Sequence, residues 1–182
     1  GDERAQGAAA LMLAVRNTIE TPLSKDLLFA WHRTVMAGRR HVATGQWRTD
    51  AEPMQVVAGA YGHEKVHFEA PPSSRVPSEM ARFIRWFNET APGGRKAIQK
   101  AAVRSAVAHL YFESIHPFED GNGRIGRALS EKALSQRLGR PALLSLSNAI
   151  EAKHRDYYDA LKEAQQSNEI TPWLTWFVRM TV

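Results

Sequence analysis

The 182-residue chain is long enough for one domain with a hydrophobic core, and its 43% apolar and 24% charged residues are typical of a globular protein. It has no cysteine, no apolar run long enough to cross a membrane and no signal-peptide pattern, so disulfides are excluded and we expect a cytoplasmic protein. The net charge of +5 favours anionic partners, such as phosphates or nucleic acid. Because the chain begins at Gly1, we expect a single domain, residues 1–182, of a longer protein with an upstream region.

Two helices and a hairpin are predicted in the first part of the chain. Residues 4–19 carry apolar side chains at helical spacing, and Ser24 is a typical N-cap for a second helix that ends near residue 36. Residues 54–58 and 65–69 predict two short strands around the segment AGAYGH, which favours a β-hairpin.

Helices resume after the hairpin and continue to the end of the chain. Residues 97–114 are apolar on most sides, so we expect a central, buried helix. Asn148 and Glu151 have the spacing of a capping box, which predicts one helix to about residue 167. The other expected helices cover residues 78–88, residues 122–138 and the segment that starts at Thr171-Pro172. The sequence therefore predicts an all-α, mainly helical fold with one short hairpin.

The segment HPFEDGNGRIGR, residues 116–127, contains a G-x-G-x-x-G pattern. A dinucleotide-binding turn with this pattern needs a preceding strand and an acidic residue about 20 positions later, within a βαβ unit. Here a helical pattern precedes the glycines, and no pair of parallel strands is apparent. We therefore reject the dinucleotide-binding interpretation.

The same segment can bind phosphates in another way. Gly121 and Gly123 stand at the start of a predicted helix, where backbone N–H groups and the helix dipole favour an anion. Arg124 and Arg127 are three residues apart, so they share a helix face and can grip phosphate oxygens. This combination favours a bound di- or triphosphate.

Two further groups of the segment are chemically suited to act on such a phosphate. Asp120 could hold a Mg²⁺ ion, and His116 could accept a proton near neutral pH, while Phe118 is expected to anchor the loop in the core. Each residue also has an ordinary structural interpretation, such as a turn or an ion pair between Arg127 and Glu131. Because all these groups fall within twelve residues, we favour phosphoryl or nucleotidyl transfer.

The segment resembles the core motif of the Fic domain family, H-x-F-x-[DE]-G-N-G-R-x-x-R, and matches it at every specified position. Gly45-Gln46-Trp47-Arg48 resembles the G-x-x-R element before the family's hairpin flap, and Asp156-Tyr157-Tyr158 with Leu161 resembles the segment after its core helix. The resemblance implies a protein adenylyltransferase, which moves AMP from ATP to a Ser, Thr or Tyr hydroxyl of a target protein and releases pyrophosphate.

The resemblance also implies roles for individual residues. His116 would be the general base and Asp120 the Mg²⁺ ligand. Asn122, with the backbone of Gly121 and Gly123, would hold the α-phosphate. Arg124 and Arg127 would hold the β- and γ-phosphates. The flap that aligns the target by strand addition would comprise Met54, Gln55, Val56 and Val57, and the adenine pocket Tyr157, Tyr158 and Gln165. Core packing or a solvated helix face is the alternative for the three adenine-pocket residues.

The chain lacks the family's inhibitory motif, [ST]-x-x-x-E-[GN]: Ser147 and Glu151 have its spacing, but Ala152 follows. We expect a domain without self-inhibition. Its inhibitory helix would be absent, upstream of Gly1 or on another chain. Whether the protein forms a homodimer is left open by the sequence. Two alternative functions remain. One is the transfer of another phosphate-containing group, and the other is a binding module for nucleic acid or protein that uses residues 39–41 (Arg-Arg-His). No nucleic-acid motif accompanies this cluster, so nucleic acid is not expected as a partner.

Overall fold

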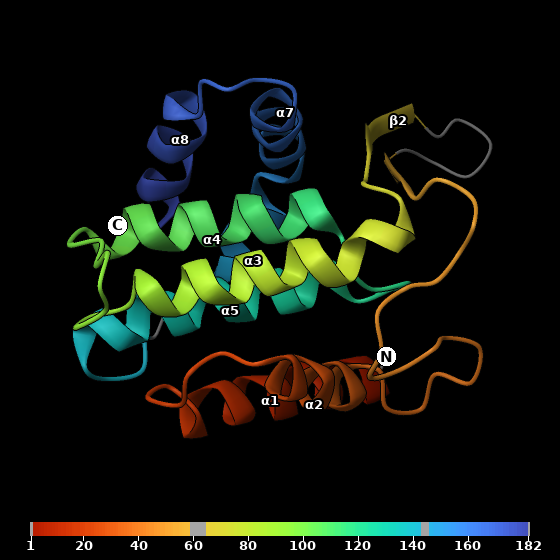
Figure 1. Cartoon of the computed structure of the whole chain (residues 1–182), viewed down its shortest axis with the longest axis horizontal. Coiled ribbons are helices and arrows are strands. Elements are labelled where there is room, and N and C mark those ends of the chain that lie inside the picture. The colour runs from red at the N-terminus through yellow and green to blue at the C-terminus, as the bar shows by residue number, and fades with distance from the viewer. Residues whose placement is uncertain (1, 59–64, 143–145, 182) are drawn as a thin grey trace.

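Helices form nearly all of the regular structure in the computed structural model, which describes residues 2–58, 65–142 and 146–181 (Figure 1). None of the helices in these ranges is long and apolar enough to cross a membrane. The helices are α1 (Asp2–Asn17), α2 (Lys25–Val35), α3 (Val76–Glu89), α4 (Ala101–Ile115), α5 (Asn122–Leu138), α6 (Leu146–Ala152), α7 (His154–Gln165) and α8 (Thr171–Thr181), with a short 3-10 helix, η1 (Ser73–Arg75).

The helices are arranged around α4 and α5, which pack against each other along their length (Figure 1). The α1–α2 pair covers α5, α3 lies against α4, and α7 and α8 pack on α4 from the opposite side to α1 and α2. Helix α4 is buried on most of its circumference, which confirms the expectation of a central helix.

Two clusters of buried side chains hold these layers together. The larger cluster contains side chains from all five helices α1 through α5. It includes Trp31, Phe83 and Phe112, each at most 1% exposed. The smaller cluster lies between α4 and α6 to α8, where Trp173 and Phe177 are equally buried. Large aromatic side chains contribute most of the apolar area in such clusters, so α4 is fixed from both sides.

The predicted hairpin is present. Strands β1 (Gln55–Ala58) and β2 (Lys65–Glu69) pair antiparallel, with Gln55 opposite Glu69 and an irregularity between Val56 and Val57. The turn predicted at residues 59–64 lies outside the described residues. The mainly helical fold with one short hairpin is therefore confirmed.

Several predicted helix boundaries are wrong. The single helix expected from Asn148 to residue 167 is divided at Lys153, whose φ of −124° and ψ of 39° leave the helical region, although no glycine or proline marks the break. Asn148 is not an N-cap, because α6 already begins at Leu146, where a 1% exposed side chain enters the core. Helix α4 starts at Ala101 rather than residue 97, because backbone hydrogen bonds tie Lys96 and Ile98 to the end of α3.

Candidate active site

His116 ends helix α4 in an unusual backbone conformation. Its φ of 50° and ψ of 60° are left-handed, and it is the only non-glycine residue with positive φ in the described part of the chain. Such a conformation costs free energy and persists only when surrounding contacts hold it. One such contact is the hydrogen bond from the His116 N–H to the carbonyl oxygen of Phe112, at 2.9 Å.

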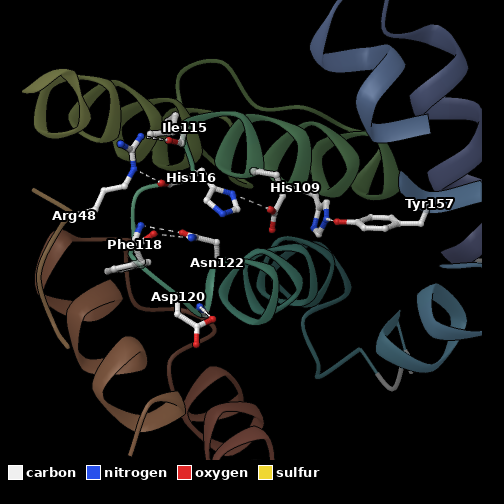
Figure 2. A network of polar contacts seen from close by, with 10 residues as sticks. Arg48, His109, Ile115, His116, Phe118, Asp120, Asn122 and Tyr157 are labelled. Atoms are coloured by element: carbon white, nitrogen blue, oxygen red, sulfur yellow. Dashed lines mark hydrogen bonds and ion pairs between the residues drawn. The ribbon is translucent and has the colours of Figure 1, made fainter. Parts of the chain in front are cut away.

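Arg48 supplies most of the other contacts that hold this turn (Figure 2). Its Nε donates to the carbonyl oxygen of His116 at 2.7 Å, and its Nη2 donates to that of Ile115 at 3.2 Å. The same Nη2 also donates to the carbonyl oxygen of Pro71 at 2.6 Å. The Arg48 N–H also donates to the carbonyl oxygen of Pro117 at 2.9 Å. Arg48 is only 4% exposed, and burial lowers its pKa from the usual value. Arg48 therefore holds the backbone on both sides of His116, with its guanidinium at Ile115 and its backbone N–H at Pro117.

The interior of the loop is closed by Asn122 and Phe118 (Figure 2). The Asn122 amide donates to the Phe118 carbonyl oxygen at 2.8 Å and accepts from the Phe118 N–H at 2.9 Å. The Phe118 ring is fully buried, as expected, and stacks on His32 with ring centroids 3.9 Å apart. The Asn122 side chain thus holds the loop, and the residue is only 2% exposed.

His32, on α2, is a second support of the loop that the sequence analysis missed. Its Nδ1 accepts a hydrogen bond from the Gly45 N–H at 2.9 Å, so Nε2 carries the proton and donates to the Asp120 carbonyl oxygen at 2.9 Å. Burial is the main cause that lowers the pKa of His32, which favours this neutral form. No sequence signal separated His32 from the other polar positions of an amphipathic helix.

The anion cradle expected at the start of α5 has the required backbone. Gly121 has a φ of 89°, and its N–H donates to Asp120 Oδ1 at 2.6 Å. Helix α5 then begins at Asn122, and the N–H groups of its first turn have no acceptor within the helix. A helix start of this kind attracts anions.

Arg124 and Arg127 both lie at this helix start. Arg124 donates to the Val35 carbonyl oxygen at 3.1 Å, and its Nη2 is 3.7 Å from Asp120 Oδ1. The Nη1 of Arg127 lies 3.3 Å from the position that a Cβ of Gly123 would occupy, so this guanidinium lies back over the first turn of α5. The structure therefore brings both cations to the cradle that the sequence predicted.

Glu113, which the sequence analysis did not consider, lies beside the side chain of His116. Its Oε2 is 3.6 Å from His116 Nδ1, and its side chain is 6% exposed. Burial alone would raise the pKa of Glu113, but the contact with His116 and the nearby charges of His109, His116 and Arg127 outweigh burial and lower it below the usual value. The lowered pKa favours the ionised form of this carboxyl group.

Helix α7 carries the residues proposed for the adenine pocket. The Tyr157 hydroxyl is hydrogen-bonded to His109 Nε2 at 2.9 Å, and this side chain is 3% exposed, so it is part of the core (Figure 2). Tyr158 and Gln165 are half-buried. On the flap, the Met54 carbonyl oxygen accepts from the Ala70 N–H at 2.9 Å, and Gln55 is exposed.

A Mg²⁺ ion would find one carboxylate at this site. Within the ranges that the structure describes, no three His, Asp or Glu side chains form a group that could hold a metal. The Asp120 side chain is 46% exposed beside the anion cradle. This arrangement fits Mg²⁺, which is commonly held by one or two carboxylates and takes its other ligands from substrate phosphates and water.

Comparison with known proteins shows the family of the chain. Residues 22–134 match the model of the Fic/DOC family. The chain belongs to the Fic/DOC family. It is 33% identical over 160 residues to the protein adenylyltransferase Fic of Culex quinquefasciatus, and the matched region covers 86% of this chain and 27% of the relative. It is 32% identical over 99 residues to the probable protein adenylyltransferase of Aquifex aeolicus, and the matched region covers 54% of this chain and 27% of the relative.

Solved structures of Fic proteins share the fold. A Fic family protein from Desulfovibrio desulfuricans superposes with a TM-score of 0.75 at 29% identity, over 93% of this chain and 48% of that protein. A Fic-domain signalling protein from Bacteroides thetaiotaomicron gives a TM-score of 0.70 at 21% identity, over 99% and 68% of the two chains. The chain spans about a quarter of the length of the two curated relatives named above.

Proposed function

We propose that this domain is a protein adenylyltransferase that moves AMP from ATP to a Ser, Thr or Tyr hydroxyl of a target protein. The observation that carries the proposal is the loop from His116 to Arg127, on which a histidine and an anion cradle stand together. Arg48 and His32 hold this loop from outside it, so the site is preorganised before ATP binds.

The proposed reaction needs one proton transfer and one exchange of bonds at phosphorus. Nε2 of His116 takes the proton of the acceptor hydroxyl, and the hydroxyl oxygen bonds to the α-phosphorus. The bond between that phosphorus and the bridging oxygen breaks, and its electron pair leaves with pyrophosphate. The backbone of residues 121–123 would hold the α-phosphate together with Asn122, and Arg124 and Arg127 would hold the β- and γ-phosphates. A Mg²⁺ ion on Asp120 would neutralise phosphate charge.

The remaining parts of the proposal concern recognition. The hairpin residues Met54 to Val57 would pair with an extended segment of the target protein. Adenine would lie against α7, where Tyr158 and Gln165 are accessible and Tyr157 would contribute from the core behind them. No inhibitory motif occurs in the sequence, so we propose a domain active on its own, and an inhibitory helix would come from upstream or from another chain.

Radiolabelled ATP tests the proposal. Protein incubated with Mg²⁺ and ATP labelled at the α-phosphorus should carry the label on a target or on itself, and the His116→Ala variant should not, although it still binds ATP. Label from the γ-phosphorus alone would indicate phosphate transfer instead. No label, together with salt-sensitive binding to DNA, would support a binding module. Mass spectrometry of a cell lysate treated with the protein and ATP would then identify the modified side chain.

A further inference from the structure

A buried carboxylate lies behind His116, on the preceding turn of α4. Glu113 Oε2 and His116 Nδ1 are 3.6 Å apart, which is close enough for an ion pair and slightly longer than a hydrogen bond. Both His116 Nδ1 and the other oxygen of Glu113, Oε1, are buried and have no hydrogen-bond partner. A buried ring nitrogen without a hydrogen-bond partner therefore faces one oxygen of a buried carboxylate, Oε2, in the interior.

Burial of this carboxylate is not explained by stability. Transfer of a charge into the protein interior costs several kcal/mol. This cost is roughly equal to the free energy that a good ion pair returns, so a buried ion pair adds little net stability. Glu113 makes no ion pair with Arg127 in the described part of the chain, although the arginine's charge acts on it at longer range. His116 is thus the one side chain within ion-pair distance of this carboxylate among the described residues.

The surroundings leave room for the carboxylate in this place. A Cβ at Gly126, on the facing side of α5, would lie 2.5 Å from Glu113 Oε1 and 3.4 Å from His109 Cε1. Only a glycine at position 126 therefore lets the carboxylate occupy its place beneath His116 without displacement. The packing of α5 on α4 is in this way adapted to Glu113.

The geometry decides which ring nitrogen of His116 can act as a base. Nδ1 is buried and faces a carboxylate, which can only accept a hydrogen bond, so the ring proton belongs on Nδ1. The His116 side chain is 17% exposed, and because Nδ1 contributes almost nothing, this exposure belongs to its other atoms. Nε2 then keeps its lone pair for a proton from outside.

We propose that Glu113 is a positioning residue, which holds the proton of neutral His116 on Nδ1 and stabilises the imidazolium that forms when Nε2 accepts a proton. The proposal deepens the proposed AMP transfer and rests on it for its kinetic consequence. Carboxylates paired with histidines act in this way in unrelated enzymes, where they fix the tautomer and the ring orientation.

Nitrogen-15 NMR of the chain labelled at histidine tests the tautomer without any need for activity. The signals of His116 are assigned by their loss in the His116→Ala variant. In the unaltered protein at neutral pH we expect neutral His116 to be protonated at Nδ1, and in the Glu113→Ala variant we expect a mixture of both tautomers. Protonation at Nε2 in the unaltered protein, or no change in the variant, would overturn the proposal.

Kinetics provide the second measurement. We expect Glu113→Ala to lower the kcat of AMP transfer by about 100-fold, while the KM for ATP stays within about twofold, because Glu113 acts through His116 and not on the nucleotide. Glu113→Gln can still accept a hydrogen bond but has no charge, so we expect a loss of only about tenfold. Exposed Glu163 on α7 provides the control variant Glu163→Gln, with unchanged kcat.

The combined outcomes separate the two proposals. An NMR change in a protein that never transfers AMP would leave the positioning of His116 intact and refute the proposed function. AMP transfer at an unchanged kcat in Glu113→Ala would refute the role of Glu113 and leave the function intact. If Glu113→Ala does not fold, Glu113→Gln carries the kinetic measurement, and an unaltered kcat in that variant would refute the proposal.

Discussion

Arg48 and His116 are joined by a 2.7 Å hydrogen bond from the guanidinium Nε of the first to the backbone oxygen of the second, across 68 residues of sequence. The bond links the segment before the hairpin to the turn that carries the proposed base. Since the same guanidinium also binds the carbonyl oxygens of Ile115 and Pro71, it connects three chain segments at one point.

Removal of this guanidinium should damage both stability and activity. We expect Arg48→Met to lower the free energy of unfolding by about 2–4 kcal/mol, because three buried or partly buried carbonyl oxygens lose their donor. We expect Arg48→Lys to recover only part of this loss, since one ammonium cannot reproduce the planar fork. Urea denaturation measures the stability of each variant. An exposed arginine, Arg140, provides the control Arg140→Met, and equal effects at both positions would refute the argument.

Gly126 offers a way to move the Glu113 carboxylate without altering Glu113 itself. Because a Cβ would lie 2.5 Å from Glu113 Oε1, we expect Gly126→Ala to displace the carboxylate from His116 and to lower the kcat of AMP transfer about tenfold. The two changes should not be additive: in a Glu113→Ala background, Gly126→Ala should lower kcat little further. Independent, additive losses in this double-mutant cycle would show that the glycine serves another purpose.

The loop from His116 to Arg127 was predictable because its parts are consecutive in sequence. Glycines, arginines and an N-terminal helix turn in one short run specify the local backbone that an anion needs, and the positive φ of Gly121 agrees with that expectation. The helical fold was predictable for a similar reason, since apolar periodicity is a local pattern.

The supports of the loop could not be predicted, because their roles depend on tertiary contacts. His32 binds a carbonyl 88 residues away in the chain, and Glu113 matters only because the left-handed turn at His116 places the ring beside it. The break at Lys153 also had no local signal, since no glycine or proline stands there. Apolar periodicity in the sequence specifies which face of a helix is buried. It does not specify which polar groups from other segments form hydrogen bonds or ion pairs at that face.

Glu131 makes the stability of the protein depend on pH in a direction that can be tested. This carboxyl is 4% exposed and one of its oxygens, Oε2, has no partner, and burial raises the pKa of Glu131 to about 7, with only partial compensation from Arg127. A raised carboxyl pKa stabilises the fold below the unfolded pKa, and this contribution is lost as pH rises through about 7.

We therefore expect Glu131→Gln to stabilise the protein above pH 7. The gain at pH 8 should reach up to about 3 kcal/mol, from about 1.4 kcal/mol per pH unit, and should shrink towards zero near pH 4.5. Urea denaturation of both proteins across this pH range measures the difference. Exposed Glu151 provides the control variant Glu151→Gln. A gain for Glu131→Gln that does not depend on pH would contradict the assignment of this pKa.

Lys132 fixes the end of α1 to α5. Loss of the Lys132 side chain should therefore increase local unfolding of α1. The ammonium group of this fully buried residue donates to the carbonyl oxygens of Thr18, Ile19 and Thr21, the last two at 3.0 and 2.7 Å. These oxygens follow the C-terminus of α1, where helix carbonyls lack partners and a cation is favourable.

We expect Lys132→Met to keep the packing volume but to remove the donor, with a loss of about 2–4 kcal/mol in the free energy of unfolding. Since α1 contacts the rest of the fold mainly through α2 and α5, its amide hydrogens should exchange faster, while those of α4 should change only by the global loss. Hydrogen exchange with mass spectrometry resolves the two helices. An exposed lysine gives the control Lys153→Met, and faster exchange in α4 than in α1 would be incompatible with a local role for Lys132.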